Sequence, residues 1–243
     1  MLSGKLVVHD DSWQRSYADE AALLKADQKD NFIEIHHIGS TSIIDVYAKP
    51  QIDIALIVKD LEKSKSLENI GYEFKGCLNI PFRYFFGKKT EGLHVNLHVM
   101  ESGNPELEGF LAFRDYMNSH PEARKEYSDL KLKLKKLLES PKNQHLLNEY
   151  TLGKNDFITS ILKKAGFKGY CMRLVSHYLE KDYEKEKFPI FKPSDIKIVF
   201  YKGSEIIGYA NADGVTKHVS FFEVSENEDY FRNRFERYLE TLK

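Results

Sequence analysis

Apolar residues recur with two different periods along the first two thirds of the chain. After a pair of capping aspartates they recur at helical spacing, which predicts an amphipathic helix over residues 12–29. Residues 93–100 alternate between apolar and polar, as in a strand with two different faces. The expected strands are 32–37, 52–58, 83–86 and 93–100, and the expected helices are 12–29, 60–70, 105–119, 122–138 and 148–164. Together they predict a mixed α/β (α+β) fold.

Beyond Gly166 the pattern changes, and we place a domain boundary near residue 168. The first domain is then 1–168 and the second is a small α+β module over 169–243. A module of that size is small for an independent core but is possible if it packs on the first unit. Its final helix is expected to pack its apolar face on the module's own short sheet. Its expected elements are a helix over 172–183, strands over 196–201, 205–209 and 218–224, and a final amphipathic helix over 229–242.

The composition is that of an ordinary soluble globular protein. Of 243 residues, 42% are hydrophobic and 30% are charged. Basic residues number 36 and acidic residues 37, so no general attraction draws the chain to nucleic acid or to an anionic membrane. Cys77 and Cys171 have no metal-type spacing and suit a reducing compartment. No apolar run is as long as a membrane span or a signal peptide core, so we predict a cytoplasmic protein.

A Gly-Ser turn followed by an aspartate on an apolar strand has the layout of a nucleotidyltransferase site. Gly39 lets the backbone approach a phosphate closely, and Ser40 and Thr41 offer hydroxyl and N–H donors to its oxygens. A helix beginning at this turn would add positive potential from its free N–H groups. Asp53 lies within the strand 52–58 and would hold a divalent cation, Mg²⁺, that bridges phosphate oxygens.

Three polar residues alternate along the strand 93–100 and share one of its faces: His94, Asn96 and His98. If this strand neighbours the strand of Asp53, all three face the same site. The histidines would then act as general base or as metal ligands, and Asn96 would contact the substrate. The alternative is an ordinary solvated strand face.

Basic residues that would contact phosphate are Lys49, Arg83 and Lys154, with Lys88 as a further candidate. The alternative for any of them is a solvated surface charge. The lysine-rich run over 131–136 is expected to be a solvated helix face. Tyr150 is expected to pack in the core, with stacking on a base as the alternative.

Several of these segments, in the same order, resemble the GrpB family over residues 5–166. They are HIGST at 37–41, KPQIDI at 49–54, RYFF at 83–86, HVNLHV at 94–99, FRDY at 113–116 with HP at 120–121, the segment 126–131, and 150–157. That family is placed in the nucleotidyltransferase superfamily. The resemblance implies a mixed sheet flanked by helices, with a helical C-terminal half that completes the groove. The superfamily's second strand carboxylate is absent, because Ala55 stands at that position.

The tail has a weaker resemblance to the GNAT acetyltransferase fold. Residues 198–210 are similar to that fold's central hairpin, and 223–242 to a later strand and the helix on the cofactor side. Acetyltransferases hold the pyrophosphate of coenzyme A on glycine N–H groups at that helix start. Here the stretch has no glycine, and Glu228 and Asp229 would repel a pyrophosphate. We therefore expect a degenerate accessory module that binds no coenzyme A.

Three functions are compatible with these features. The favoured one is a nucleotidyltransferase that binds a nucleoside triphosphate over Gly39 and Ser40. Asp53 would hold the cation, and Lys154 would neutralise phosphate charge. It would transfer a nucleotidyl group to the hydroxyl, amine or phosphate of an acceptor. The missing second carboxylate favours the alternative, a catalytically weak protein that binds a nucleotide or another phosphorylated small molecule. An acetyl-coenzyme A-dependent acyltransferase is the third, and it depends wholly on the tail.

Overall fold

The chain divides into two compact units in a computed structural model. The structure describes residues 5–90, 92–138, 149–174, 196–213, 216, 218–222 and 224–242. The first unit comprises Met1–Cys77 and Phe82–Phe167, and the second comprises Leu78–Pro81 and Lys168–Lys243. Among the described residues, no helix is both long and apolar enough to cross a membrane.

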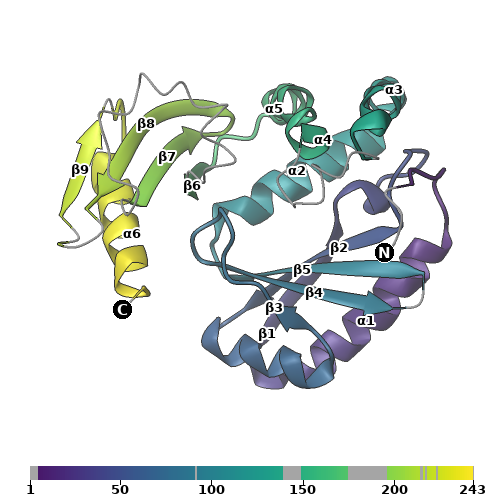
Figure 1. Cartoon of the computed structure of the whole chain (residues 1–243), viewed down its shortest axis with the longest axis horizontal. Helices are drawn as coiled ribbons and strands as arrows, with labels where there is room; N and C mark the ends of the chain where they lie inside the picture. Colours follow the sequence, from purple (N-terminus) through teal and green to yellow (C-terminus); the bar gives the residue numbers. More distant parts are fainter. Residues whose placement is uncertain are drawn as a thin grey trace. The chain divides into compact units, whose positions relative to one another are not determined.

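The first unit is built on a five-stranded mixed sheet with the strand order β1-β2-β5-β4-β3 (Figure 1). Strands β2 and β5 are parallel, and the other neighbouring pairs are antiparallel. The bounds are β1 Phe32–Ile38, β2 Gln51–Val58, β3 Glu73–Phe74, β4 Arg83–Thr90 and β5 Leu93–Glu101. The four predicted strands are therefore confirmed. The prediction for β4 was too short, because Lys88 and Lys89 pair with β5 although they interrupt the apolar run.

Helices cover one face of this sheet with apolar side chains. Helix α1 spans Ser12–Gln28, and the segment predicted as a helix over 60–70 is a 3-10 helix, η3, over Glu62–Ile70. Gly71 ends η3 with a φ of 89°, as its position predicted. Leu24 of α1 and Leu67 of η3 are fully buried against Ile54 and Leu97 of the sheet. This face is the main core of the unit.

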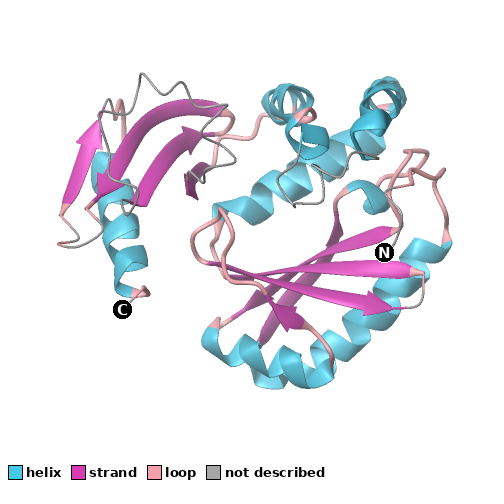
Figure 2. Cartoon of the chain, in the orientation of Figure 1, coloured by secondary structure: helices cyan, strands magenta, loops and turns pink. Residues whose placement is uncertain are grey.

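The opposite face carries the helices α2 Pro105–Ser119, α3 Pro121–Leu138, α4 Glu149–Leu152 and α5 Asn155–Lys164 (Figure 2). The Asn104 side chain caps α2 by accepting a hydrogen bond from the Glu106 N–H at 3.1 Å. The single helix predicted over 148–164 is wrong, because Gly153 and Lys154 separate α4 from α5. That break places Lys154 at the beginning of α5.

In the residues that the structure describes, the second unit has an antiparallel sheet of four strands in chain order and one helix. Its elements are β6 Tyr170–Leu174, β7 Ile196–Lys202, β8 Glu205–Ala212, β9 Val219–Phe222 and α6 Glu228–Glu240. Phe231 and Phe235 of α6 are fully buried, and the Phe231 ring stacks 4.3 Å from that of Phe200. The helix predicted over 172–183 is wrong at its start, because residues 170–174 pair with β7 as β6. Its remainder, from residue 175, lies outside the described residues.

Candidate functional site

Asp53 lies at the centre of a polar row that crosses two parallel strands. In the register of β2 and β5, Asp53 is opposite Asn96, while Gln51 is opposite His94 and Ala55 is opposite His98. Alternate residues of a strand share a face, so these residues all lie on one side of the sheet, which we call the Asp53 face. Helix α2 covers the end of this face that carries Ile57 and Met100. The Asn96 amide donates a hydrogen bond of 2.8 Å to Asp53 Oδ1, and the Gln51 amide lies 3.5 Å from the same oxygen.

The second carboxylate oxygen of Asp53 faces the turn that follows β1. Gly39 has a φ of +70°, and a Cβ there would lie 2.3 Å from Asp53 Oδ2. A glycine is required both by this left-handed backbone and by the close approach. Within the described part of the chain, Oδ2 has no hydrogen-bond donor. Asp53 therefore presents one oxygen to the amides of the sheet and the other to the Gly-Ser turn.

The turn itself is a 3-10 helix of three residues, η2 Ser40–Ser42, rather than the start of an α-helix. Thr41 is buried, and its hydroxyl donates to the Gln51 carbonyl at 3.1 Å, which anchors the turn to β2. Ser40 is partly exposed and lies beside the Tyr127 hydroxyl of α3. Of the three predicted turn residues, Gly39 and Ser40 thus border Asp53, and the Thr41 side chain holds the turn in place.

Three lysines from different elements lie around Asp53, and we call them the lysine cluster: Lys49 before β2, Lys131 on α3, and Lys154 at the start of α5. The Nζ atoms of Lys49 and Lys154 lie 4.8 and 4.7 Å from the centroid of the Tyr150 ring. Tyr150 is only 2% exposed, so it packs in the core and offers no surface for a base. Lys49 and Lys154 were both predicted from the sequence.

Sequence reasoning missed Lys131, whose predicted place on a solvated helix face is wrong. Its side chain is only 2% exposed, its Nζ donates to the Tyr47 carbonyl at 2.7 Å, and it lies 4.5 Å from the Tyr127 ring centroid. Its neighbours Lys133 and Lys136 are exposed, as expected. The signal was in the spacing, because Lys131 follows the apolar Ala123 and Tyr127 at intervals of four residues.

Burial and like charge weaken the protonated forms of these lysines. The pKa of Lys154 falls to about 8, first because of burial and then because of Lys49. The pKa of Lys131 lies well below its ordinary value for the same first reason, with Lys154 adding repulsion. Burial also lowers the pKa of Lys49 and raises that of Asp53, although Asn96 and Lys154 oppose the latter shift. Among the described residues, three lysine side chains therefore lie near one carboxylate in a poorly solvated region that disfavours their charged forms.

His98 and Arg83 lie together beyond Asp53, because His98 is two residues after Asn96 on β5 and is opposite Ala55. The Arg83 guanidinium donates to His98 Nδ1 at 3.2 Å and to the Cys77 carbonyl at 3.1 Å. The His98 ring packs edge-on against Phe85 and Phe110, and burial and Arg83 keep its pKa well below the ordinary value. The structure does not bring Arg83 to the lysine cluster. The roles of both residues stay predictions.

Two other basic residues lie on the opposite face, among the apolar core. Lys88 donates to both carboxylate oxygens of Glu20 at 2.9 and 3.0 Å, so its predicted phosphate contact is wrong. His37 is buried, stacked 4.8 Å from Tyr17, and its Nε2 lies 3.1 Å from the Thr41 hydroxyl. Burial lowers the pKa of His37 to about 4. His37 therefore supports the turn from behind as a neutral ring.

The possible metal ligands around Asp53 fit a cation that is bound together with substrate phosphates, rather than one coordinated by protein groups alone. No three His, Cys, Asp or Glu residues in the described part of the chain are grouped as metal ligands. The neighbouring position, Ala55, is fully buried and apolar. Mg²⁺ is commonly bound by one or two carboxylates together with substrate phosphates and water. Asp53 Oδ2 supplies the one carboxylate oxygen that a single Mg²⁺ needs. A site for two metal ions would need a second carboxylate, and Ala55 stands at that position.

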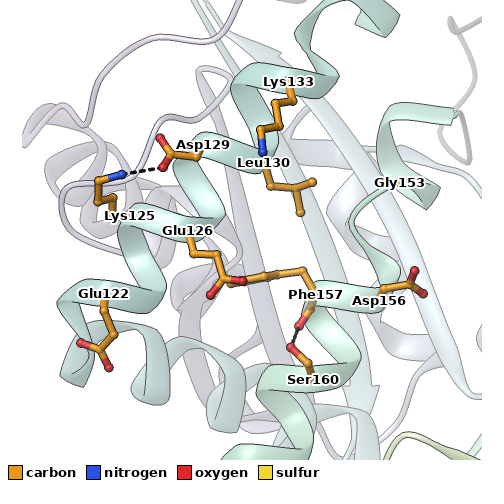
Figure 3. Close-up of a pocket in the computed structure, with 10 residues that line it drawn as sticks. All are labelled: Glu122, Lys125, Glu126, Asp129, Leu130, Lys133, Gly153, Asp156, Phe157 and Ser160. Atoms are coloured by element: carbon orange, nitrogen blue, oxygen red, sulfur yellow. Dashed lines mark hydrogen bonds and ion pairs between the residues drawn. The ribbon is translucent and has the colours of Figure 1, made fainter.

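A separate pocket of about 630 Å³ lies between α3 and α5 (Figure 3). None of the predicted site residues lines it, and its ten lining residues include Glu122, Glu126, Asp129 and Asp156 with Lys125 and Lys133. Lys125 and Asp129 form an ion pair at 2.7 Å. Phe157 lines this pocket and stacks on Tyr127 at 5.0 Å, so the two rings separate it from the Asp53 side.

Comparison with known proteins places the similarity in the first unit. The family described as GrpB protein matches residues 4–164. The UPF0157 protein YqkA of Bacillus subtilis is 33% identical over 165 residues, which are 66% of this chain and 47% of that protein. The chain therefore spans about half the length of that relative. The glutamate-rich protein GrpB of Alkalihalophilus pseudofirmus is 34% identical over 65% of this chain and 94% of its own.

A solved structure agrees with these matches. The crystal structure of the conserved protein GrpB from Enterococcus faecalis is 30% identical, with a TM-score of 0.60 over 66% of this chain and 96% of that one. The main part of the second unit, Lys168–Lys243, lies beyond the residues that the family matches, and its resemblance to an acetyltransferase is not shown.

Proposed function

The chain belongs to the GrpB family, and from that premise we propose that its Asp53 site binds a nucleoside triphosphate through the phosphates. The observation that supports this most strongly is the charge balance of the lysine cluster. Three lysines lie near one carboxylate, and Lys131 is almost completely buried, with no carboxylate of the described residues within hydrogen-bond distance. A buried excess of positive charge is costly unless an anion completes it. A chain of phosphates supplies several negative charges in that small volume.

Each residue then has a distinct part in binding. Gly39 and Ser40 bring backbone and hydroxyl donors beside Asp53 Oδ2. Lys49, Lys131 and Lys154 neutralise the phosphates from the helical side. Asn96 and Gln51 orient the Asp53 carboxylate through its other oxygen.

Asp53 would hold a Mg²⁺ ion that the nucleotide brings with it. Such an ion neutralises phosphate charge and polarises a phosphoryl oxygen. The protein's own contribution is the orientation of Asp53, because both of its amide contacts leave Oδ2 free on the side of the turn.

Nucleotidyl transfer is the reaction that this arrangement would support. An acceptor hydroxyl, amine or phosphate would attack the α-phosphorus, and pyrophosphate would leave. Lys154 suits the protonation of that leaving group, because its pKa of about 8 lies near neutrality. His94 is the more accessible candidate base, because Phe85 and Phe110 pack against His98. Binding without turnover is the second candidate function, and the lone carboxylate beside Ala55 favours it.

A thermal-shift screen of the four nucleoside triphosphates, with and without Mg²⁺, tests the proposal. At a hundredfold excess over Kd, a ligand adds about 2.7 kcal/mol of stability. Asp53→Asn keeps the shape of the side chain and removes its charge, so it should remove the part of the stabilisation that depends on Mg²⁺. Asp129→Asn, an exposed carboxylate on α3, is the matched control and should leave that part unchanged.

Two results separate the candidates. Release of pyrophosphate by the wild type, abolished in Asp53→Asn, supports transfer. Stabilisation without pyrophosphate release supports binding alone. No stabilisation by any of the four nucleotides would refute both.

A further inference from the structure

A second group of basic residues lies on the Asp53 face, on the other side of Asp53 from the Gly-Ser turn. In the antiparallel pair β4–β5, Lys89 is opposite His94 and Gly87 is opposite Asn96. Lys75, which follows β3, lies across Gly87, since a Cβ at Gly87 would lie 2.8 Å from the Lys75 Nζ. We call Lys75, Lys89 and His94 the basic patch. It begins one strand away from Asp53, next to the asparagine that orients the carboxylate.

This end of the sheet face is open to solvent. Gln51, Gly87, His94 and Asn96 all keep part of their surface exposed. At the far end of the same face, beneath α2, the apolar side chains of Ala55, Ile57 and Met100 are at most 1% exposed. The polar end therefore has the accessibility that a substrate needs.

The charges of the patch point to an anion. Lys89 is the cross-strand partner of His94, and Lys75 Nζ lies over Gly87 of the same strand as Lys89. Burial lowers the pKa of His94, and the charges of Lys89 and Lys75 lower it further. Among the described residues, Glu73 pairs with this patch, and its carboxylate oxygen lies 3.4 Å from the Lys75 Nζ. Glu73 is 76% exposed, and an ion pair that exposed contributes little and is readily exchanged for another anion.

We infer that the acceptor in the proposed transfer is itself an anion, a phosphate monoester whose phosphate binds to the basic patch. This inference rests on the proposed function for the nucleotide. With one phosphate on the lysine cluster's side of Asp53 and another on the patch's side, an acceptor oxygen between them is directed at the nucleotide. That oxygen forms a bond to the α-phosphorus, the bond from that phosphorus to pyrophosphate breaks, and the neutral His94 imidazole accepts the acceptor's proton.

Histidine NMR of the full chain provides the test, with glycerol 3-phosphate as the probe and glycerol as its uncharged control. The ring signal of His94 is assigned by its loss in His94→Gln. We expect a saturable shift of that signal with glycerol 3-phosphate and none with glycerol. The apparent affinity should fall at least tenfold in Lys75→Ala/Lys89→Ala and stay unchanged in Lys63→Ala, an exposed lysine elsewhere on the unit. Gly87→Ala, which displaces the Lys75 ammonium without changing charge, should weaken binding by a smaller factor.

The titration is repeated with a non-hydrolysable ATP analogue and Mg²⁺ present. If the analogue binds, the His94 signal should still shift with glycerol 3-phosphate when the analogue is saturating. That result would place the two anions in separate sites, as inferred. Three results would overturn the inference: no response at His94, an equal response in the double lysine variant, or displacement of the probe by the analogue. Failure of the proposed function would give a different result. No nucleotide would stabilise the protein in the thermal-shift screen, while the His94 signal would still respond to glycerol 3-phosphate.

Discussion

The two faces of the first unit's sheet use buried lysine in opposite ways. On the face covered by α1, Lys88 is paired with Glu20, which also accepts a hydrogen bond from the Tyr72 hydroxyl at 2.8 Å. On the Asp53 face, Lys131 donates to a backbone carbonyl, and its contacts in the described structure include no carboxylate within hydrogen-bond distance. A paired buried charge is part of the core, and a buried charge without a counter-ion leaves a place for an anionic ligand. We therefore expect Lys88 of β4 to contribute to stability and Lys131 of α3 to contribute to the proposed binding of an anion.

The largest effect is expected from breaking the pair on the α1 face. Lys88→Met leaves the Glu20 carboxylate buried without its ammonium, and the side chain of Glu20 is only 10% exposed. Removing one partner of a buried pair costs about 3–5 kcal/mol. Urea unfolding should show that loss in the free energy of unfolding. A loss below about 1 kcal/mol would mean that Lys88 is solvated, and the contrast between the faces would fail.

Lys131→Met is the matched substitution on the Asp53 face. It removes an uncompensated buried charge, which stabilises the fold, and a hydrogen bond to the Tyr47 carbonyl, which costs about 1 kcal/mol. The two effects oppose each other, so we expect the free energy of unfolding to change by less than about 1 kcal/mol in the same urea experiment. A destabilisation equal to that of Lys88→Met would show that Lys131 is structural.

A smaller effect sharpens the role of the Gly-Ser turn. Gly39 and Gly76 have φ values of +70° and +72°, but only Gly39 has atoms within 4 Å of its missing Cβ. Either change to alanine lowers the free energy of unfolding by about 1–2 kcal/mol, because a residue with a Cβ is strained in the left-handed conformation. Gly39→Ala also forces the Asp53 carboxylate to move, so it should cost more than Gly76→Ala and abolish nucleotide stabilisation. Equal losses in thermal unfolding and retained binding would contradict the close approach.

The smallest effect concerns pH. The folded pKa of Lys154, about 8, lies below its ordinary 10.5, so the unfolded chain binds more protons between these values. Stability without ligand should therefore rise from pH 8 to 10.5. Phosphate needs the charged lysine, so affinity should fall by up to tenfold per pH unit above pH 8. Calorimetry should show both trends weakened in Lys154→Met. A pH-independent affinity would exclude Lys154 from binding.

The sequence predicted the strands of the sheet and which polar residues lie on them in the candidate site, because both depend on local patterns. Alternation along 93–100 and the apolar run at 52–58 were sufficient to place Asp53, Asn96 and the two histidines on strands. That β2 and β5 are neighbours was a condition of the argument, and their register fulfils it.

Long-range packing accounts for what the sequence did not reveal. Lys131 is buried because α3 packs against the segment at Tyr47, 84 residues away in the chain. Lys88 is neutralised by Glu20, 68 residues away. Residues 170–174 form β6 because they pair with β7, more than 20 residues later in the chain, and local propensity does not predict such pairing. Composition treats all of these lysines alike, and only the packing distinguishes them.

The most direct test of the site is isothermal titration of ATP with Mg²⁺ into the wild type and into Lys131→Met. Lys133→Met, exposed on the same helix, is the control. A hydrogen bond to a charged group contributes about 1.5–3 kcal/mol, so Lys131→Met should weaken binding about tenfold to a hundredfold, with Lys133→Met unchanged. Equal affinity in all three proteins, or no binding to the wild type, would contradict a phosphate site at the lysine cluster.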